Sequence, residues 1–170
     1  MDAHGRTDAA VLVPIYGWPD TPGLVFTERR GDLRRHAGEV SFPGGRQDQP
    51  DEDLRATALR EAEEEIGLDP GDVELIGALP PIGTFVTSYK VHPFVGLIPD
   101  DLVFSPSPDE VETVLRLSID DLIAGYGKRR VVRRGMPIRT DTYVVEGNLI
   151  WGATARILGE LLRRLSRSER

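Results

Sequence analysis

Glutamate occupies four of the five positions from 61 to 65. On a helix over 53–66, Glu61, Glu64 and Glu65 share one face by their i, i+3 and i+4 spacing. Like charges at this spacing destabilise an isolated helix by about 0.2–0.5 kcal/mol per pair. We therefore expect the fold to bury the other side of this helix and to supply a counter-charge.

A divalent cation is the counter-charge that these carboxylates favour. Arg60 can offset Glu64 at i+4, but one arginine does not neutralise three carboxylates. Mg²⁺ prefers oxygen ligands and often binds through a few carboxylates, water and substrate phosphates. The preceding Pro-Gly-Gly at 43–45 lets the backbone approach closely, so the Gly45 carbonyl is a further candidate ligand. The alternative is a charged helix face that is simply solvated.

Short apolar runs bounded by Pro, Gly or Asp predict strands on both sides of this helix. A closing helix is predicted within 151–170, with apolar residues at helical spacing. Together they predict an α/β fold in which a mixed sheet is covered on both faces. The predicted strands lie at 9–16, 23–28, 73–79, 90–98 and 110–118, with shorter ones within 129–135, 141–147 and 148–153.

Length and composition limit the class of protein. A chain of 170 residues with 39% hydrophobic composition fits one domain over 1–170. We expect disordered ends at about 1–8 and 166–170. The net charge of -7 disfavours nucleic acid or anionic membrane as a partner. The absence of cysteine excludes thiolate chemistry, and no run approaches the ~18 apolar residues of a membrane span, so we expect a soluble, cytoplasmic protein.

The stretch "REAEEEIGL", from Arg60 to Leu68, matches the second half of the Nudix box at every position. The whole box is placed at about 45–68, and its first half departs from the pattern by one residue. Five residues after Gly45 the chain reaches Asp51, whereas Glu52 has the right distance to Arg60. A loop one residue longer accommodates this difference. The sequence thus resembles a Nudix hydrolase.

A second resemblance narrows the substrate. The stretch 26–45 is similar to the signature of the coenzyme A pyrophosphatases, a Nudix subfamily. Phe26 and Arg30 depart from the usual residues of that signature, and 151–158 is similar to the closing helix of these proteins. The matching residues are Thr27, Arg29, Arg34, Gly38, Phe42, Pro43, Gly44 and Gly45.

The resemblance implies a Nudix-type α/β/α sandwich with a mixed sheet and hydrolysis that depends on Mg²⁺ or Mn²⁺. Glu61 and Glu65 are then the first-choice metal ligands, joined by the Gly45 carbonyl. Glu64 is either a third ligand or the residue that orients the attacking water. In this superfamily the general base varies and sometimes comes from a loop.

Three acidic residues after the Pro-rich connection are candidates for that base. Glu110 and Glu112 come first, with Asp109 behind them. Ordinary charge at a strand edge is the alternative explanation for all three.

The implied substrate is coenzyme A or an acyl derivative, cleaved to adenosine 3',5'-bisphosphate and 4'-phosphopantetheine. Arg29 and Arg34 could bind its phosphates through bidentate contacts. The basic run 128–135 is either another phosphate clamp or, as we favour, protection of an edge strand. Trp151 is predicted to be a core anchor.

Two alternatives stay open. One is a Nudix pyrophosphatase for ADP-ribose, another nucleotide sugar or a dinucleotide. The other is a non-catalytic Nudix module that binds a nucleotide, because fold does not fix function. In each case the ligand is a small nucleotide rather than nucleic acid or membrane. Many Nudix proteins dimerise, so a homodimer is also open.

Overall fold

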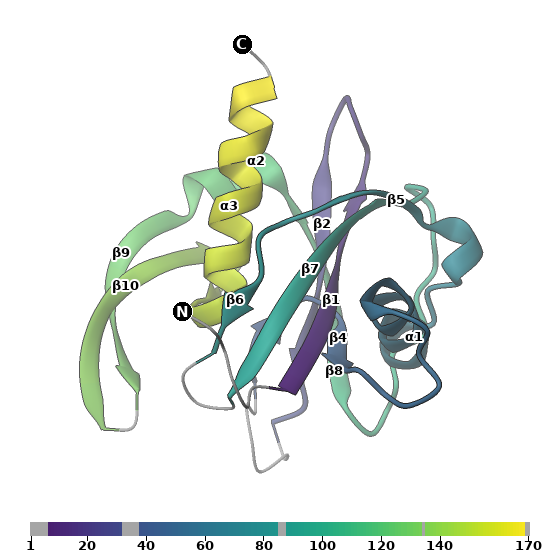
Figure 1. Cartoon of the computed structure of the whole chain (residues 1–170). Helices are drawn as coiled ribbons and strands as arrows, with labels where there is room; N and C mark the ends of the chain where they lie inside the picture. The colour runs from purple at the N-terminus through teal and green to yellow at the C-terminus, as the bar shows by residue number, and fades with distance from the viewer. Residues whose placement is uncertain (1–6, 32–37, 85–87, 134, 169–170) are drawn as a thin grey trace.

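The computed structural model describes residues 7–31, 38–84, 88–133 and 135–168. Three helices and a short 3₁₀ turn at Pro70–Asp72 accompany two sheets in these ranges (Figure 1). The helices are α1 Leu54–Ile66, α2 Ile119–Ala124 and α3 Gly152–Ser168. The large sheet contains β1 Thr7–Tyr16, β2 Gly23–Arg29, β3 Val40–Ser41, β4 Gly44–Arg46, β5 Glu74–Ala78, β6 Ile82–Gly83, β7 Tyr89–Leu97 and β8 Val111–Ser118; the small sheet contains β9 Tyr126–Arg133, β10 Met136–Val145 and β11 Asn148–Ile150.

The large sheet is mixed, as predicted. Its main path is β3-β2-β1-β7-β5, while β4 pairs with β1, β6 with β7 and β8 with β2. β1 and β7 run parallel, from Thr7 opposite Tyr89 to Ile15 opposite Leu97. The other pairs in this sheet are antiparallel. β7, which is far from β1 along the chain, thus lies beside β1 at the centre of the sheet.

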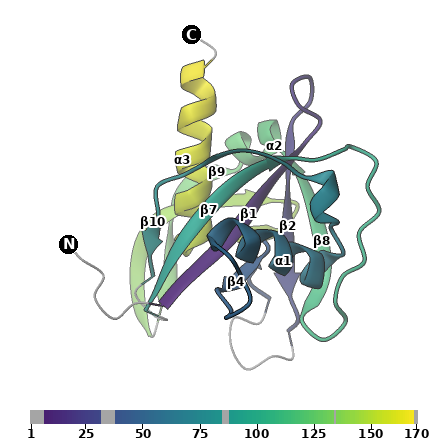
Figure 2. The same ribbon diagram turned by 45° about the vertical axis from the view of Figure 1, so that its right-hand side comes forward.

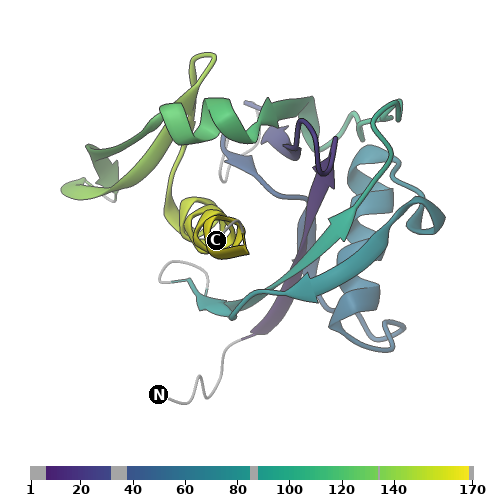
Figure 3. The same ribbon diagram turned by 90° about the horizontal axis from the view of Figure 1, so that it is seen from above.

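The two faces of the large sheet carry separate apolar layers, because successive side chains of a strand point to opposite faces. On β1, Ala10 and Leu12 pack with Ala62 and Ile66 of α1. Val13 belongs to the cluster under α3. Figure 2 shows α1 lying over one face of the sheet, and Figure 3 shows α3 on the other. The predicted α/β/α arrangement is confirmed.

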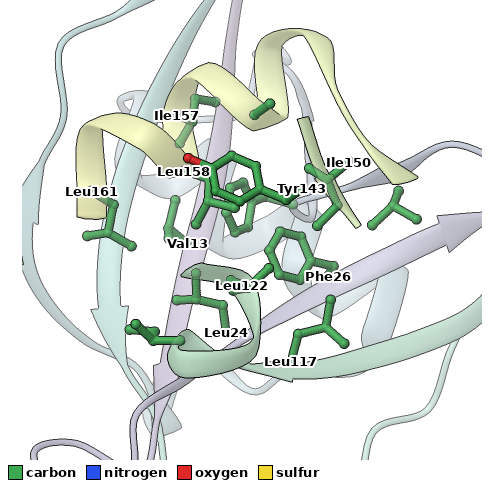
Figure 4. Close-up of a cluster of buried hydrophobic side chains, with 14 of the residues drawn as sticks. Val13, Leu24, Phe26, Leu117, Leu122, Tyr143, Ile150, Ile157, Leu158 and Leu161 are labelled. Atoms are coloured by element: carbon green, nitrogen blue, oxygen red, sulfur yellow. The ribbon is translucent and has the colours of Figure 1, made fainter. Parts of the chain in front are cut away.

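A stripe of buried apolar side chains along α3 explains the position of this helix. Ile157, Leu158 and Leu161 follow one another at i, i+1 and i+4, and each is at most 3% exposed. Figure 4 shows these side chains packed on Val13 and Phe26 from the sheet. Phe26 also stacks on Phe42 at 4.6 Å between ring centroids. Apolar burial therefore fixes α3 against the face opposite α1.

The small sheet has the order β11-β10-β9, so β9 is an edge strand in the described structure. β9 and β10 form a hairpin that lies on the far side of α3 from the large sheet (Figure 3). The basic run 128–135 falls largely on β9. This position agrees with the preferred explanation, in which charge protects an edge from further pairing.

The short elements were missed from the sequence. α2, β3, β4 and β6 have six residues or fewer. Such lengths show no hydrophobic period. The sequence also predicted disorder up to about residue 8 and from about 166, whereas β1 begins at Thr7 and α3 continues to Ser168. Within the described ranges, no helix combines the length and apolar character needed to cross a membrane.

Candidate functional site

Helix α1 holds the glutamates in a fixed orientation. Asp53 caps its N-terminus by accepting a hydrogen bond from the Ala56 N–H at 2.8 Å. Gly67 ends the helix in the left-handed conformation, with φ 70°. Ala62 and Ile66 are buried against the sheet. Because that face is fixed, the side chains of Glu61 and Glu65 are directed to one edge of the contact with the sheet.

At that edge the glutamates meet β4. Gly45 pairs with Ala10 of β1, and a Cβ at Gly45 would lie 2.5 Å from Glu61 Oε1. The Gly44 N–H donates to Glu65 Oε2 at 3.3 Å. The absence of a side chain at Gly45 therefore allows the Glu61 carboxylate to lie against the backbone, whereas a Cβ at Gly44 would meet Ala10 and Val11 of β1.

The raised pKa values of Glu61 and Glu65 show that ionising both carboxylates is unfavourable without a further positive charge. Burial raises the pKa of Glu65 to about 8, and the charges of Glu61 and Glu110 act in the same direction. Burial also raises the pKa of Glu61, partly offset by Arg60. Two partly buried carboxylates close to a third are destabilised when ionised, and a nearby cation would reverse that effect. The local field thus favours a bound cation.

Arg60 organises the rim of the site. Its Nε and Nη2 donate to the two oxygens of Asp51 at 2.9 and 3.0 Å. Its Nη1 donates to Glu61 Oε1 at 3.0 Å and to Glu64 Oε2 at 3.1 Å. The bidentate contact holds the pKa of Asp51 at about 2. Arg60 therefore links the loop after β4 to the glutamate helix.

This contact resolves the shifted half of the box. The Asp51 carboxylate is only 5% exposed and also accepts from the Thr57 hydroxyl at 3.0 Å, whereas Glu52 is exposed. The sequence left the choice between Asp51 and Glu52 open. The lengthened loop presents Asp51, and not Glu52, to Arg60.

Glu64 lies further out than Glu61. Its side chain is 59% exposed, against 17% for Glu61. It remains near the site because both glutamates share the Arg60 guanidinium. Glu63 is exposed. The arrangement suits Glu64 for contact with water or an outer ligand position.

Glu110 and Arg29 reach the site from the other side. The register that places Arg29 opposite Val111 brings the residue before Val111 next to β2, and the Arg30 N–H donates to the Glu110 carbonyl at 3.0 Å. Glu110 and Arg29 both act on the pKa of Glu65, with opposite signs. Glu110 is exposed, as are Glu112 and Asp109. Arg34, the other predicted phosphate-binding arginine, lies outside the described residues.

A cleft of about 740 Å³ opens from Gly44 and Gly45 onto the face of the sheet opposite α1. Its volume is in the range of sites for small organic ligands. β10 and the start of α3 form its outer wall. Among the lining residues are the apolar side chains of Val11, Phe42, Val91, Ile138 and Ile157, the aromatic side chains of Tyr89 and Trp151, and the arginines Arg29, Arg46, Arg139 and Arg156.

The donor set fits a hard divalent cation. Glu61, Glu65 and the Gly45 carbonyl are oxygen donors, and such cations complete their coordination with water and phosphate oxygens. In the described part of the chain, three acidic or histidine side chains are nowhere grouped tightly enough to hold a metal by themselves. The protein ligands predicted here would therefore need the substrate or water as partners.

Several lining residues were missed from the sequence. Trp151 was predicted to be a core anchor, but it is half-buried and lines the cleft. Arg46 and the first residues of α3 line the same cleft. The α3 residues are far from the glutamates along the chain, and Arg46 lies in no motif of its own. Only the packing of α3 and β10 over the sheet brings them together.

Comparison with known proteins identifies the family. Residues 6–135 match the family described as NUDIX domain. A protein from Escherichia coli O7:K1 (strain IAI39 / ExPEC), named "Uncharacterized Nudix hydrolase NudL", is 46% identical over 155 residues, covering 90% of this chain and 80% of that protein.

Solved structures share the fold at low identity. A Nudix hydrolase from M. smegmatis, RenU, has a TM-score of 0.65 and 14% identity over 96% of this chain and 87% of its own. An Ap4A hydrolase from C. elegans in a binary complex has a TM-score of 0.63 and 15% identity, covering 94% of this chain and 98% of that one. At such identities the likeness concerns the fold alone.

Proposed function

The chain belongs to the Nudix family and is a hydrolase of small nucleotide substrates, and from this premise we propose that it cleaves coenzyme A or acyl-coenzyme A. Water adds across the pyrophosphate bond, giving adenosine 3',5'-bisphosphate and 4'-phosphopantetheine or its acyl form. The signature around Thr27, Arg29 and Phe42 supports this substrate, because it resembles that of coenzyme A pyrophosphatases.

The junction at Gly44 and Gly45 is the observation that carries the proposal. Glu61 and Glu65 lie against these glycines on the α1 side. The cleft opens from the same glycines on the opposite side. A substrate with a pyrophosphate next to bulky groups can therefore place its anhydride by the carboxylates and its remaining parts in the cleft.

Glu61, Glu65 and the Gly45 carbonyl would hold the divalent ion, with Glu64 as a further ligand or as the group that orients water. When bound, Mg²⁺ or Mn²⁺ supplies charge neutralisation at the pyrophosphate and lowers the pKa of bound water. The Arg60 contacts hold Glu61 and Glu64 in place for this role.

The remaining roles belong to Arg29 and Glu110. Arg29 lines the same cleft as Gly44, where its guanidinium can donate to a substrate phosphate. Glu110 lies close enough to alter the pKa of both Glu61 and Glu65. We assign it to accept the proton as water attacks phosphorus and the bond to the bridging oxygen breaks. Arg34 is proposed as a second hydrogen-bond donor to a substrate phosphate, on the basis of its place in the motif alone.

Substrate profiling tests the proposal. Coenzyme A, dephospho-coenzyme A, ADP-ribose, NADH and Ap4A are incubated in parallel with Mg²⁺, with Mn²⁺ and with a chelator, and products are identified by mass. We expect metal-dependent release of 4'-phosphopantetheine, faster from coenzyme A than from the dephospho form. Turnover of the other nucleotides alone would contradict the coenzyme A assignment. No turnover of any substrate would favour a binding module.

A further inference from the structure

The first turn of α3 faces the same cleft as the glycines of β4. Gly152, Ala153 and Thr154 all line it. The first N–H groups of a helix have no partner within the helix. In α1 and α2, Asp53 and Ser118 cap such groups with side-chain oxygens. Trp151, at the corresponding position before α3, has no side-chain acceptor, and Gly152 begins the helix with φ +68°.

Thr154 provides the independent observation. It is only 7% exposed and begins the buried stripe that continues with Ile157, Leu158 and Leu161. Across the ranges that the structure describes, its hydroxyl makes no hydrogen bond, although it borders the cleft. Among the described residues no enclosed side-chain oxygen lacks a partner, so the Thr154 hydroxyl is open to the cleft rather than sealed in the core. From this position it can donate a hydrogen bond to a polar ligand group in the cleft.

The charge of the cleft indicates an anion. Four arginines line it, against one acidic side chain, Glu39, among the described residues. Arg46 pairs with Ala9 of β1, so its side chain lies on the cleft face of the sheet. Within the described ranges the Arg46 guanidinium makes no ion pair. A helix N-terminus also favours negative charge, through its N–H groups and its dipole.

We propose that the first turn of α3, with the Thr154 hydroxyl, binds a second phosphate of the substrate, a phosphate monoester distinct from the pyrophosphate that is cleaved. This inference rests on the proposed function, in which the group is the 3'-phosphate of coenzyme A. The pyrophosphate lies by Glu61 and Glu65 on the α1 side of β4. The monoester lies on the α3 side, the face of the sheet that also carries the Arg46 side chain.

This placement predicts discrimination through binding. The 3'-phosphate does not react, so its contacts are present in both the ground state and the transition state. Loss of the Thr154 contact should therefore act mainly on KM. The effect should be larger for coenzyme A than for dephospho-coenzyme A, which lacks the group.

Calorimetry without metal tests the site separately from catalysis. Adenosine 3',5'-bisphosphate, AMP and inorganic phosphate are titrated into the wild type, Thr154→Val and Thr154→Ser. Thr154→Val keeps the shape of the side chain and removes the hydroxyl, while Thr154→Ser keeps the hydroxyl. We expect the wild type to bind the bisphosphate about tenfold more tightly than AMP. That preference should fall to about twofold or less in Thr154→Val and persist in Thr154→Ser.

Three results would overturn the inference: equal binding of the bisphosphate and AMP by the wild type, an unchanged preference in Thr154→Val, or inorganic phosphate binding as tightly as the bisphosphate. Melting temperatures of the variants verify folding. KM for coenzyme A and dephospho-coenzyme A is measured alongside. If coenzyme A is not hydrolysed, the proposed function fails, and the calorimetric preference still decides the phosphate site. If it is hydrolysed without that preference, only the phosphate site fails.

Discussion

Arg60 shows why the type of a single residue matters at this site. Its guanidinium contacts Asp51, Glu61 and Glu64 within 3.1 Å. A lysine could not make these contacts together, since its single ammonium lacks the planar fork of donors. The Arg60 guanidinium thus holds Glu61 and Glu64 together at the rim of the site. The inner side of the glutamate face stays available for a metal cation.

Loss of Asp51 should destabilise the fold in a manner that depends on pH. Its pKa lies at about 2, below its ordinary value of 3.8, so its stabilising effect is complete above about pH 4 and is lost as the pH falls towards 2. Asp51→Asn should lower the free energy of unfolding at pH 7 by about 2 kcal/mol. Urea unfolding at pH 7, 4 and 2.5 should show the difference from the wild type shrinking.

Asp48→Asn is the matched control for this measurement. Asp48 is 58% exposed and lies 3.5 Å from Arg60 Nη2, so its loss should change stability by about 0.5 kcal/mol or less. A gap between Asp51→Asn and the wild type that stays constant with pH would contradict the role of the ion pair.

Gly45→Ala should damage activity more than stability. The new Cβ would meet the end of the Glu61 side chain rather than backbone, at 2.5 Å, so the carboxylate must shift. A displaced catalytic group can cost about 100-fold in rate, which we expect in kcat/KM with a melting temperature close to the wild type. Gly77→Ala is the control, because a Cβ there meets nothing within 4 Å. Equal activity in the two variants would refute the close approach.

At the scale of elements, α1 depends on its cap as well as on its buried face. Asp53→Ala removes the acceptor for the Ala56 N–H and should lower stability by about 1 kcal/mol. Asp53→Asn keeps an acceptor and should retain most of that stability. Urea unfolding compares the two, with CD as the probe. A similar loss in both variants would show that the charge of Asp53, rather than its hydrogen bond, stabilises the helix.

The elements that could be predicted are those long enough to show a hydrophobic pattern. α1 and α3 show the helical repeat, and β1, β2, β7 and β8 appear as apolar runs bounded by turn residues. β4 has three residues, two of them glycine, so no pattern predicts it. Its pairing with β1 is decided by tertiary contacts. The position of Glu61 and Glu65 at one edge of α1 could be predicted from their spacing, but the placement of Thr154 and Trp151 in the cleft lining required the packing of α3 over the sheet.

At the scale of the whole molecule, the sheet joins two apolar layers. Leu12 on the α1 side and Leu158 on the α3 side are both fully buried. Either substitution to Ala should cost about 3 kcal/mol. Because both layers share β1, each variant should still unfold in one transition, followed by fluorescence and CD. Val103→Ala, at a side chain 91% exposed, is the control. Separate transitions for the two layers would contradict a single cooperative unit.

The most direct test compares Glu65→Gln and Glu63→Gln with the wild type in the release of 4'-phosphopantetheine from coenzyme A with Mg²⁺. Glu65 is partly buried with a raised pKa, so neutral Gln should be tolerated by the fold while the anionic ligand is lost. Glu63 is exposed on another face of α1. We expect the rate to fall by about 100-fold or more in Glu65→Gln and by about twofold or less in Glu63→Gln. Equal losses in the two variants, with both folded, would contradict a metal site on this face of α1.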